Sequence, residues 1–175
     1  MRAPPPAGRR RFRQESSSSP ESGHASAQAC GSLKRWRGRY LFDNAVEFLA
    51  GAQHLEGSDD PRSREILFHL IGCSVELSLK SYLHFRGWND DRCRREVRHD
   101  LVKALAAAER LGFHRCHPDV RMLTRILSPY YRCHRIRELA KRDPAPISPE
   151  RALRAAEGLL DDVLAAVAGP PRSGH

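Results

Sequence analysis

Two histidines of this sequence lie close to arginines along the chain, a combination of side chains that is able to do chemistry on a phosphate. A histidine can act as a general base on the 2′-hydroxyl of RNA while an arginine stabilises the charge that builds on the phosphate, with no metal ion. A capping or surface histidine gives the same pattern in an arginine-rich chain, so both interpretations stay open. The candidate catalytic residues are His134, Arg132, Arg135, His99 and Arg94.

A second group of polar residues interrupts the most apolar stretch of the chain, residues 62–85. Glu76 and Lys80 are four residues apart with the acid first, which is the favourable order for an ion pair on a helix. At about 100° per residue, they share a narrow polar side of a helix whose remaining surface is apolar. Such a helix must be covered on several sides, so its polar side faces water or a cleft. A solvated ion pair of little energetic value is the plainer interpretation.

The pair His99-Asp100 opens a predicted helix, where a carboxylate satisfies free amides and complements the helix dipole. If this turn packs beside Glu76 and Lys80, four polar side chains share one cleft. A later helix, if unbroken, would carry a basic strip formed by Arg121, Arg125, Arg132 and Arg135, followed by two tyrosines for stacking on single-stranded bases. The candidate residues of a binding cleft are Glu76, Lys80, His99, Asp100, Arg121, Arg125, Tyr130 and Tyr131.

Several histidines and cysteines between residues 114 and 134 invite a zinc interpretation. Their spacing matches no usual zinc finger, and nothing in the chain resembles a phosphate-binding glycine loop or a nucleophile elbow. We therefore predict no metal site and no cofactor. The residues concerned are His114, Cys116, His117, Cys133 and His134.

The elements that would position these side chains are all expected to be helices. Apolar residues recur at helical spacing, no segment shows convincing strand alternation, and there is no internal repeat. Residues 88–96 are expected to form a loop, and Pro129 is expected to kink or split the fourth helix, with Ser128 as a new cap. The helices are expected from about Ser32 to Leu55, from Pro61 to about Phe85, from Asp100 to about Leu111, from Pro118 to about Lys141 and from Pro149 to about Val167.

Length and composition suggest one domain with a tail. Residues 1–31 are rich in Arg, Pro and Ser and are predicted to be disordered, residues 32–169 form the bundle, and residues 170–175 are a flexible C-terminus. The 175 residues carry a formal net charge of +9, which favours a polyanionic partner. However, nearly all the basic residues are arginine, as a GC-rich coding sequence produces without selection for binding. The charge therefore counts only in part as evidence for nucleic acid.

The cellular location follows from cysteines and hydropathy. The five cysteines are an odd number without paired spacing, and no secretory signal precedes them, so a reducing cytoplasm fits best. Charged residues break up the most apolar segments, so we predict a soluble protein with no membrane partner.

The segment Val75–Leu83, followed by His99-Asp100-Leu101, resembles the HEPN superfamily of small helical bundles. Many bacterial members have a Glu-x-x-Leu-Lys-x-Tyr-Leu helix followed by a Gly-His-Asp-Leu turn. Here Arg98 replaces the glycine. The resemblance implies an up-and-down bundle of four or five helices, usually a homodimer.

The HEPN superfamily includes metal-independent RNases, RNA-binding proteins and toxins that pair with small nucleotidyltransferases. Its active RNases carry an Arg followed about five residues later by His on a late helix, and this chain lacks that motif there. The resemblance therefore implies a non-catalytic module that binds RNA, a nucleotide or a protein partner. The alternative is a metal-independent RNase, the toxin of a toxin–antitoxin pair with a nucleotidyltransferase-type antitoxin.

Overall fold

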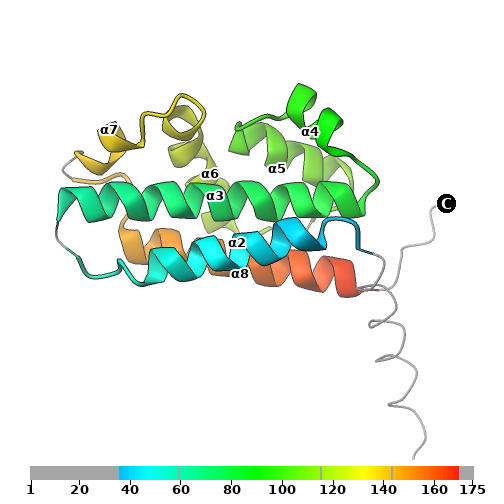
Figure 1. Cartoon of the computed structure of the whole chain (residues 1–175), viewed down its shortest axis with the longest axis horizontal. Coiled ribbons are helices and arrows are strands. Elements are labelled where there is room, and N and C mark those ends of the chain that lie inside the picture. Colours follow the sequence, from blue (N-terminus) through cyan, green and yellow to red (C-terminus); the bar gives the residue numbers. More distant parts are fainter. Residues whose placement is uncertain (1–35, 59, 115, 143, 170–175) are drawn as a thin grey trace, which may run out of the picture.

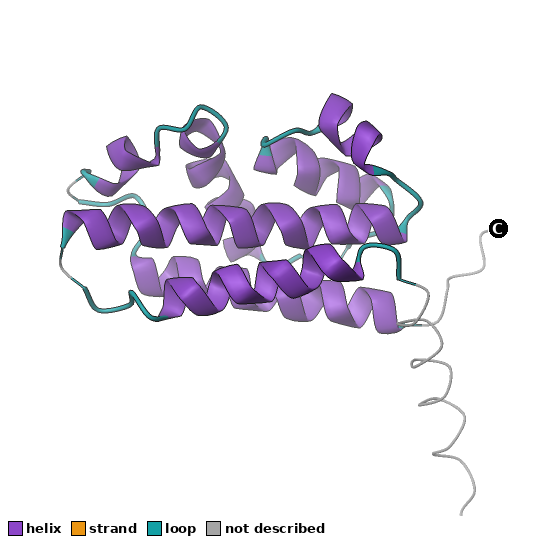
Figure 2. Cartoon of the chain, viewed as in Figure 1, coloured by secondary structure: helices purple, strands orange, loops and turns teal. Residues whose placement is uncertain are grey.

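The computed structural model describes residues 36–58, 60–114, 116–142 and 144–169, and every regular element in these ranges is a helix (Figures 1 and 2). The predicted all-α class is confirmed, with seven helices in the described residues where four or five were expected. The segments 1–31 and 170–175, predicted to be disordered or flexible, lie outside the described residues. The helices are α2 (Arg39–Gln53), α3 (Pro61–Phe85), α4 (Asp90–Glu96), α5 (Leu101–Arg110), α6 (Pro118–Tyr131), α7 (Ile136–Ala140) and α8 (Pro149–Ala168).

Helix α3 is the centre of the structure and contacts all six other described helices. Helices α2 and α8 lie together on one side of it, and the shorter helices α4 to α7 lie on the other (Figure 1). The start of α3 follows from its sequence, because the Asp60 side chain accepts a hydrogen bond from the backbone N–H of Ser63 and Pro61 occupies the first turn. Its largest fully buried side chains are Leu67, Phe68, Ile71, Val75, Leu79 and Leu83.

By length and composition, α3 is the one helix in the described ranges that could cross a membrane. Inside the bundle, 67% of its most apolar 18-residue window is buried. Core helices of soluble proteins meet the same criteria.

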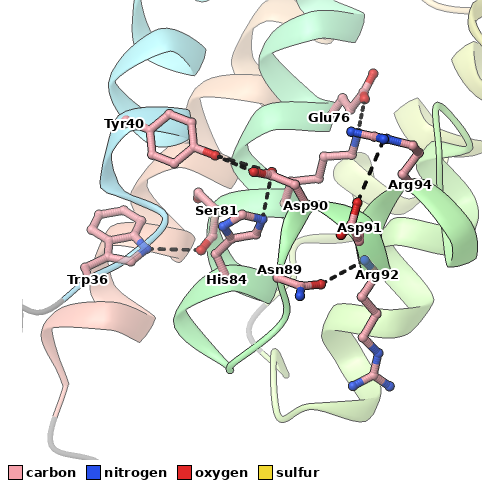
Figure 3. Close-up of polar contacts among 11 residues, drawn as sticks. Trp36, Tyr40, Glu76, Ser81, His84, Asn89, Asp90, Asp91, Arg92 and Arg94 are labelled. Atoms are coloured by element: carbon pink, nitrogen blue, oxygen red, sulfur yellow. Dashed lines mark hydrogen bonds and ion pairs between the residues drawn. The ribbon is translucent and has the colours of Figure 1, made fainter.

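The beginning of α2 packs unusually close to α3. A Cβ atom on Gly38 would lie 2.3 Å from the carbonyl oxygen of Ser81, and the indole N–H of Trp36 donates a hydrogen bond to the same oxygen at 3.0 Å (Figure 3). The absence of a side chain at Gly38 therefore lets the two backbones approach at Ser81, which the apolar spacing of α3 did not indicate.

We expect Gly38→Ala to lower the free energy of unfolding by about 2 kcal/mol, because the methyl group meets backbone atoms that have no room to move. Gly158→Ala is the matched control, since a Cβ there meets nothing within 4 Å. It should raise stability by about 0.5–1 kcal/mol, because glycine is unfavourable inside a helix. Urea unfolding followed by circular dichroism measures both changes, and equal stability of Gly38→Ala and wild type would contradict the close approach.

The prediction that residues 88–96 form a loop was wrong, because they contain α4. The Asn89 side chain accepts a hydrogen bond from the backbone N–H of Arg92 at 2.9 Å, and two acids in the first turn and two arginines in the last turn complement the helix dipole. Cys93 is the one buried residue of α4, so this segment has no apolar repeat from which a helix could be predicted.

The single helix predicted from Pro118 to about Lys141 is two helices, α6 and α7. The break follows Tyr131, whereas Pro129 and Ser128 both lie inside α6. Ser128 is therefore not the cap of a new helix, as we had expected. Pro129 lies in the last turn, where its missing N–H costs a single hydrogen bond and the helix continues past it.

Candidate functional site

Glu76 is the centre of the polar side of α3 and is only 5% exposed. The ammonium group of Lys80 donates a hydrogen bond to one carboxylate oxygen, and Nδ1 of His99 lies 3.0 Å from the other. Burial alone would raise the pKa of Glu76, but the hydrogen bonds from Lys80 and His99 outweigh it and hold the pKa below its usual value. The structure thus brings together three residues that the sequence placed in one cleft.

Asp100 has the capping role that the sequence indicated. Its carboxylate accepts a hydrogen bond from the backbone N–H of Lys103 at 3.0 Å and another from the Ser128 hydroxyl at 3.1 Å. The guanidinium of Arg132 lies 3.2 Å away. Burial alone would raise the pKa of Asp100, but these partners outweigh it and lower the pKa. Asp100 therefore joins the start of α5 to the end of α6 and holds Arg132 beside His99.

Tyr131 lies beneath His99 and is buried. Its hydroxyl donates a hydrogen bond to Sγ of Cys73 at 3.4 Å, and its ring meets the ring of His99 edge-on at 6.3 Å between centroids. Gly72 leaves the space that this ring occupies, because a Cβ there would lie 2.5 Å from it. Burial raises the pKa of Tyr131 above its usual value. The prediction that Tyr131 stacks on bases was wrong, since its ring is enclosed.

An open cleft of about 640 Å³ lies between the α4–α5 turn and the segment that follows α6. Six basic side chains and two acidic ones line it, and the rings of His99 and His134 lie 6.2 Å apart between centroids at a tilt of 60°. A neighbouring hollow shares Arg98 and His99 and adds Lys80, Arg94 and Asp90. We call the two together the basic cleft. Its basic side chains are Lys80, Arg94, Arg95, Arg98, His99, Lys103, Arg132 and His134.

The remaining sequence candidates lie outside the basic cleft. Arg121 pairs with Glu109 at 2.8 Å, and Arg135 forms an ion pair with Glu138. The predicted basic strip along one helix was wrong, because α6 ends before two of its four arginines. Arg125 lines a shallow hollow beside Asp100 and Lys103. One face of the partly buried Tyr130 ring is covered by the guanidinium of Arg142, 5.4 Å away.

Sequence reasoning missed a second polar cluster, centred on Asp90 at the end of the basic cleft. Figure 3 shows the Tyr40 hydroxyl of α2 and the His84 ring of α3 directed at this carboxylate. The hydroxyl donates a hydrogen bond at 3.3 Å, and Nε2 of His84 lies 3.3 Å from the same oxygen. His84 is only 6% exposed. The capping signal of Asn89 and the acids after it could have indicated this cluster.

We expect the buried His84 to make the protein less stable in mild acid. Burial lowers the pKa of His84 below its ordinary value of 6.5, the nearby Asp90 offsets this in part, and Lys80 adds to the lowering. The unfolded chain therefore binds a proton at His84 before the folded protein does, so the free energy of unfolding falls as the pH drops below about 6.5.

Urea unfolding at about pH 7.5 and about pH 5.5 tests this expectation. His84→Asn should reduce the loss of stability between the two pH values, and the exposed His54→Asn should leave it unchanged. An equal loss in wild type and His84→Asn would contradict it.

In the described part of the chain, no three His, Cys, Asp or Glu side chains are placed to hold a metal ion. Of the residues considered for zinc, Cys116 is buried. Burial raises the pKa of its thiol to about 11, whereas a metal ligand must be the thiolate.

No model of a known protein family matches the chain, and comparisons with curated proteins and with solved structures likewise find no match.

Proposed function

We propose that this chain is a small HEPN-like helical protein that binds single-stranded RNA in its basic cleft without cleaving it. The observation that carries the proposal is a set of three cleft side chains, Arg95, Arg98 and Lys103, which are exposed and have no ion-pair partner among the described residues. The two acids that line the same cleft already have partners, since Glu96 pairs with Arg92 and Asp100 accepts hydrogen bonds from the Lys103 backbone and from Arg132. The cleft therefore presents positive charge to a phosphate backbone.

Fluorescence anisotropy with a labelled single-stranded RNA of about 12 nucleotides tests the proposal. The double variant Arg95→Glu/Lys103→Glu should weaken binding at least about 10-fold and reduce the slope of log K against log salt by about 1.4, the value for two lost phosphate contacts. The control Lys141→Glu/Arg154→Glu makes the same charge change on exposed residues outside the cleft and should change affinity about 2-fold or less. Equal effects of the two double variants would contradict a specific site.

A second candidate function, metal-independent RNA cleavage, is favoured by the contact between His99 and Glu76. An ionised carboxylate only accepts hydrogen bonds, so Nδ1 of His99 must carry the hydrogen, which leaves Nε2 of a neutral ring as a proton acceptor. A carboxylate that orients an imidazole in this way is found in general-base catalysis. Incubation with RNA in EDTA distinguishes the two functions. We expect no cleavage, and cleavage abolished by His99→Ala would establish the RNase and make a nucleotidyltransferase-type antitoxin the partner to test.

We also propose a homodimer. The described surface exposes several large apolar side chains, among them Tyr40, Val46 and Phe48 of α2 and Ile66 of α3, and an interface between two copies would remove such side chains from water. Sedimentation equilibrium at micromolar concentration should give a mass near twice the 19.8 kDa of the chain. A single species of monomer mass would exclude the dimer.

A further inference from the structure

Two residues of the basic cleft have a backbone conformation that residues other than glycine rarely adopt. Arg98 has a φ of 47° and His134 a φ of 55°, and among the described residues these are the only two positive values outside glycine. In this left-handed region a Cβ atom crowds the following carbonyl oxygen, which costs energy at each position. Both residues line the same cleft.

Other helices of the same protein end on glycine where they need this conformation. Positive φ values are found at Gly57, Gly87 and Gly112, which follow α2, α3 and α5. Glycine adopts them without a penalty and is the usual residue after the end of a helix. Arg98 follows α4 and His134 follows α6. Among the described residues, non-glycine residues therefore have a strained backbone only where the end of a helix borders the basic cleft, and strain of this kind clusters at functional sites.

The backbone at both positions is well fixed. The N–H of Arg98 donates a hydrogen bond to the carbonyl of Cys93 at 2.9 Å, and the N–H of His134 donates to the carbonyl of Tyr131 at 3.1 Å. Arg98 lies in the α4–α5 turn and His134 in the segment after α6, and both line the cleft together with His99, which contacts Glu76. The backbone positions from which the two side chains extend are thus set before any ligand binds.

We propose that Arg98 and His134 form a phosphate subsite that holds one phosphate group of the bound ligand. A guanidinium can bind two phosphate oxygens at once, and an imidazole N–H can donate to a third. This inference rests on the proposed function, since RNA would supply the phosphate, but it assigns the subsite to two particular residues. It also explains why arginine is present where a glycine would satisfy the turn.

Replacement by glycine separates a binding role from a structural one. Arg98→Gly and His134→Gly remove the side chain and its backbone strain together, so the urea midpoint of each variant should be no lower than that of wild type. Arg98→Lys keeps the charge and the strain and should retain most of the phosphate binding. A fall in the urea midpoint of both glycine variants would show that the side chains stabilise the fold and would overturn the inference.

Titration with inorganic phosphate, followed by ¹H–¹⁵N NMR of the full chain at constant ionic strength, tests the subsite without RNA. Wild type should show saturable shifts at residues 98, 99 and 134, and each glycine variant should weaken the binding at least about 10-fold. Arg154→Ala, outside the cleft, should bind phosphate like wild type. The subsite would be overturned if wild type showed no saturable shift, or if both glycine variants bound phosphate with the same affinity as wild type.

RNA binding measured in parallel keeps the two proposals distinct. If RNA binds and depends on Arg95 and Lys103 but phosphate does not bind at Arg98 and His134, the proposed function stands and the subsite is rejected. If phosphate binds as expected and RNA does not, the subsite stands and the proposed RNA ligand is rejected.

Discussion

Glu76→Ala should lower the free energy of unfolding by about 3 kcal/mol, because it leaves the partly buried Lys80 without its partner. It should also release His99 from its fixed position, since the contact between the two side chains is lost. Urea unfolding measures the first effect. The control Glu65→Ala, on the same helix and without an ion-pair partner among the described residues, should change stability by about 0.5 kcal/mol or less.

A second variant locates the source of this loss. In Glu76→Ala/Lys80→Met no buried charge is left unpaired, so most of the lost stability should return. A double variant no more stable than Glu76→Ala would show that the ion pair is not the cause.

The lowered pKa of Glu76 also makes stability depend on acid. The contribution of Glu76 to the free energy of unfolding is complete above the ordinary pKa of 4.5 and is lost as the pH falls through the lower pKa of the folded protein.

Leu79→Ala should lower the free energy of unfolding by about 2–5 kcal/mol, the usual cost of truncating a core leucine. Leu79 is fully buried in the second half of α3, the helix that all the other described helices contact, so its truncation leaves a cavity in the core. Thermal and urea unfolding measure the loss. Leu164→Ala, at a leucine that is 40% exposed on α8, should cost less than about 1 kcal/mol, and equal losses at the two positions would show that α3 is not the core helix.

The sequence was most informative where apolar spacing and capping residues agreed. Helix α3 begins at Pro61 and ends at Phe85 as predicted, because a long apolar repeat follows an unambiguous N-cap. The sequence also raised the packing of the His99-Asp100 turn beside Glu76 and Lys80 as a condition for a shared cleft, and the structure has Nδ1 of His99 3.0 Å from Glu76. Helix α4 was missed because a short exposed helix is marked by its ends and not by apolar residues.

Other features of the site depend on packing that one sequence does not reveal. Tyr131 is enclosed because Gly72 on a distant part of the chain leaves room for its ring, and no local pattern links the two residues. The left-handed conformation of His134 follows from where α6 ends, two residues beyond the proline that was expected to kink or split the helix. Arg98 was visible in the sequence directly before His99-Asp100, but its left-handed backbone conformation became evident only from the structure.

Crosslinking of 4-thiouridine-labelled single-stranded RNA to the full chain, with the attached peptides located by mass spectrometry, tests the central claim most directly. The proposal predicts crosslinks within residues 94–100, at Lys103 and within residues 132–134, which line the basic cleft, and their loss in Arg95→Glu/Lys103→Glu. Crosslinks confined to α2 or α8, or equal crosslinking of wild type and the double variant, would contradict the assignment of the basic cleft as the RNA-binding site.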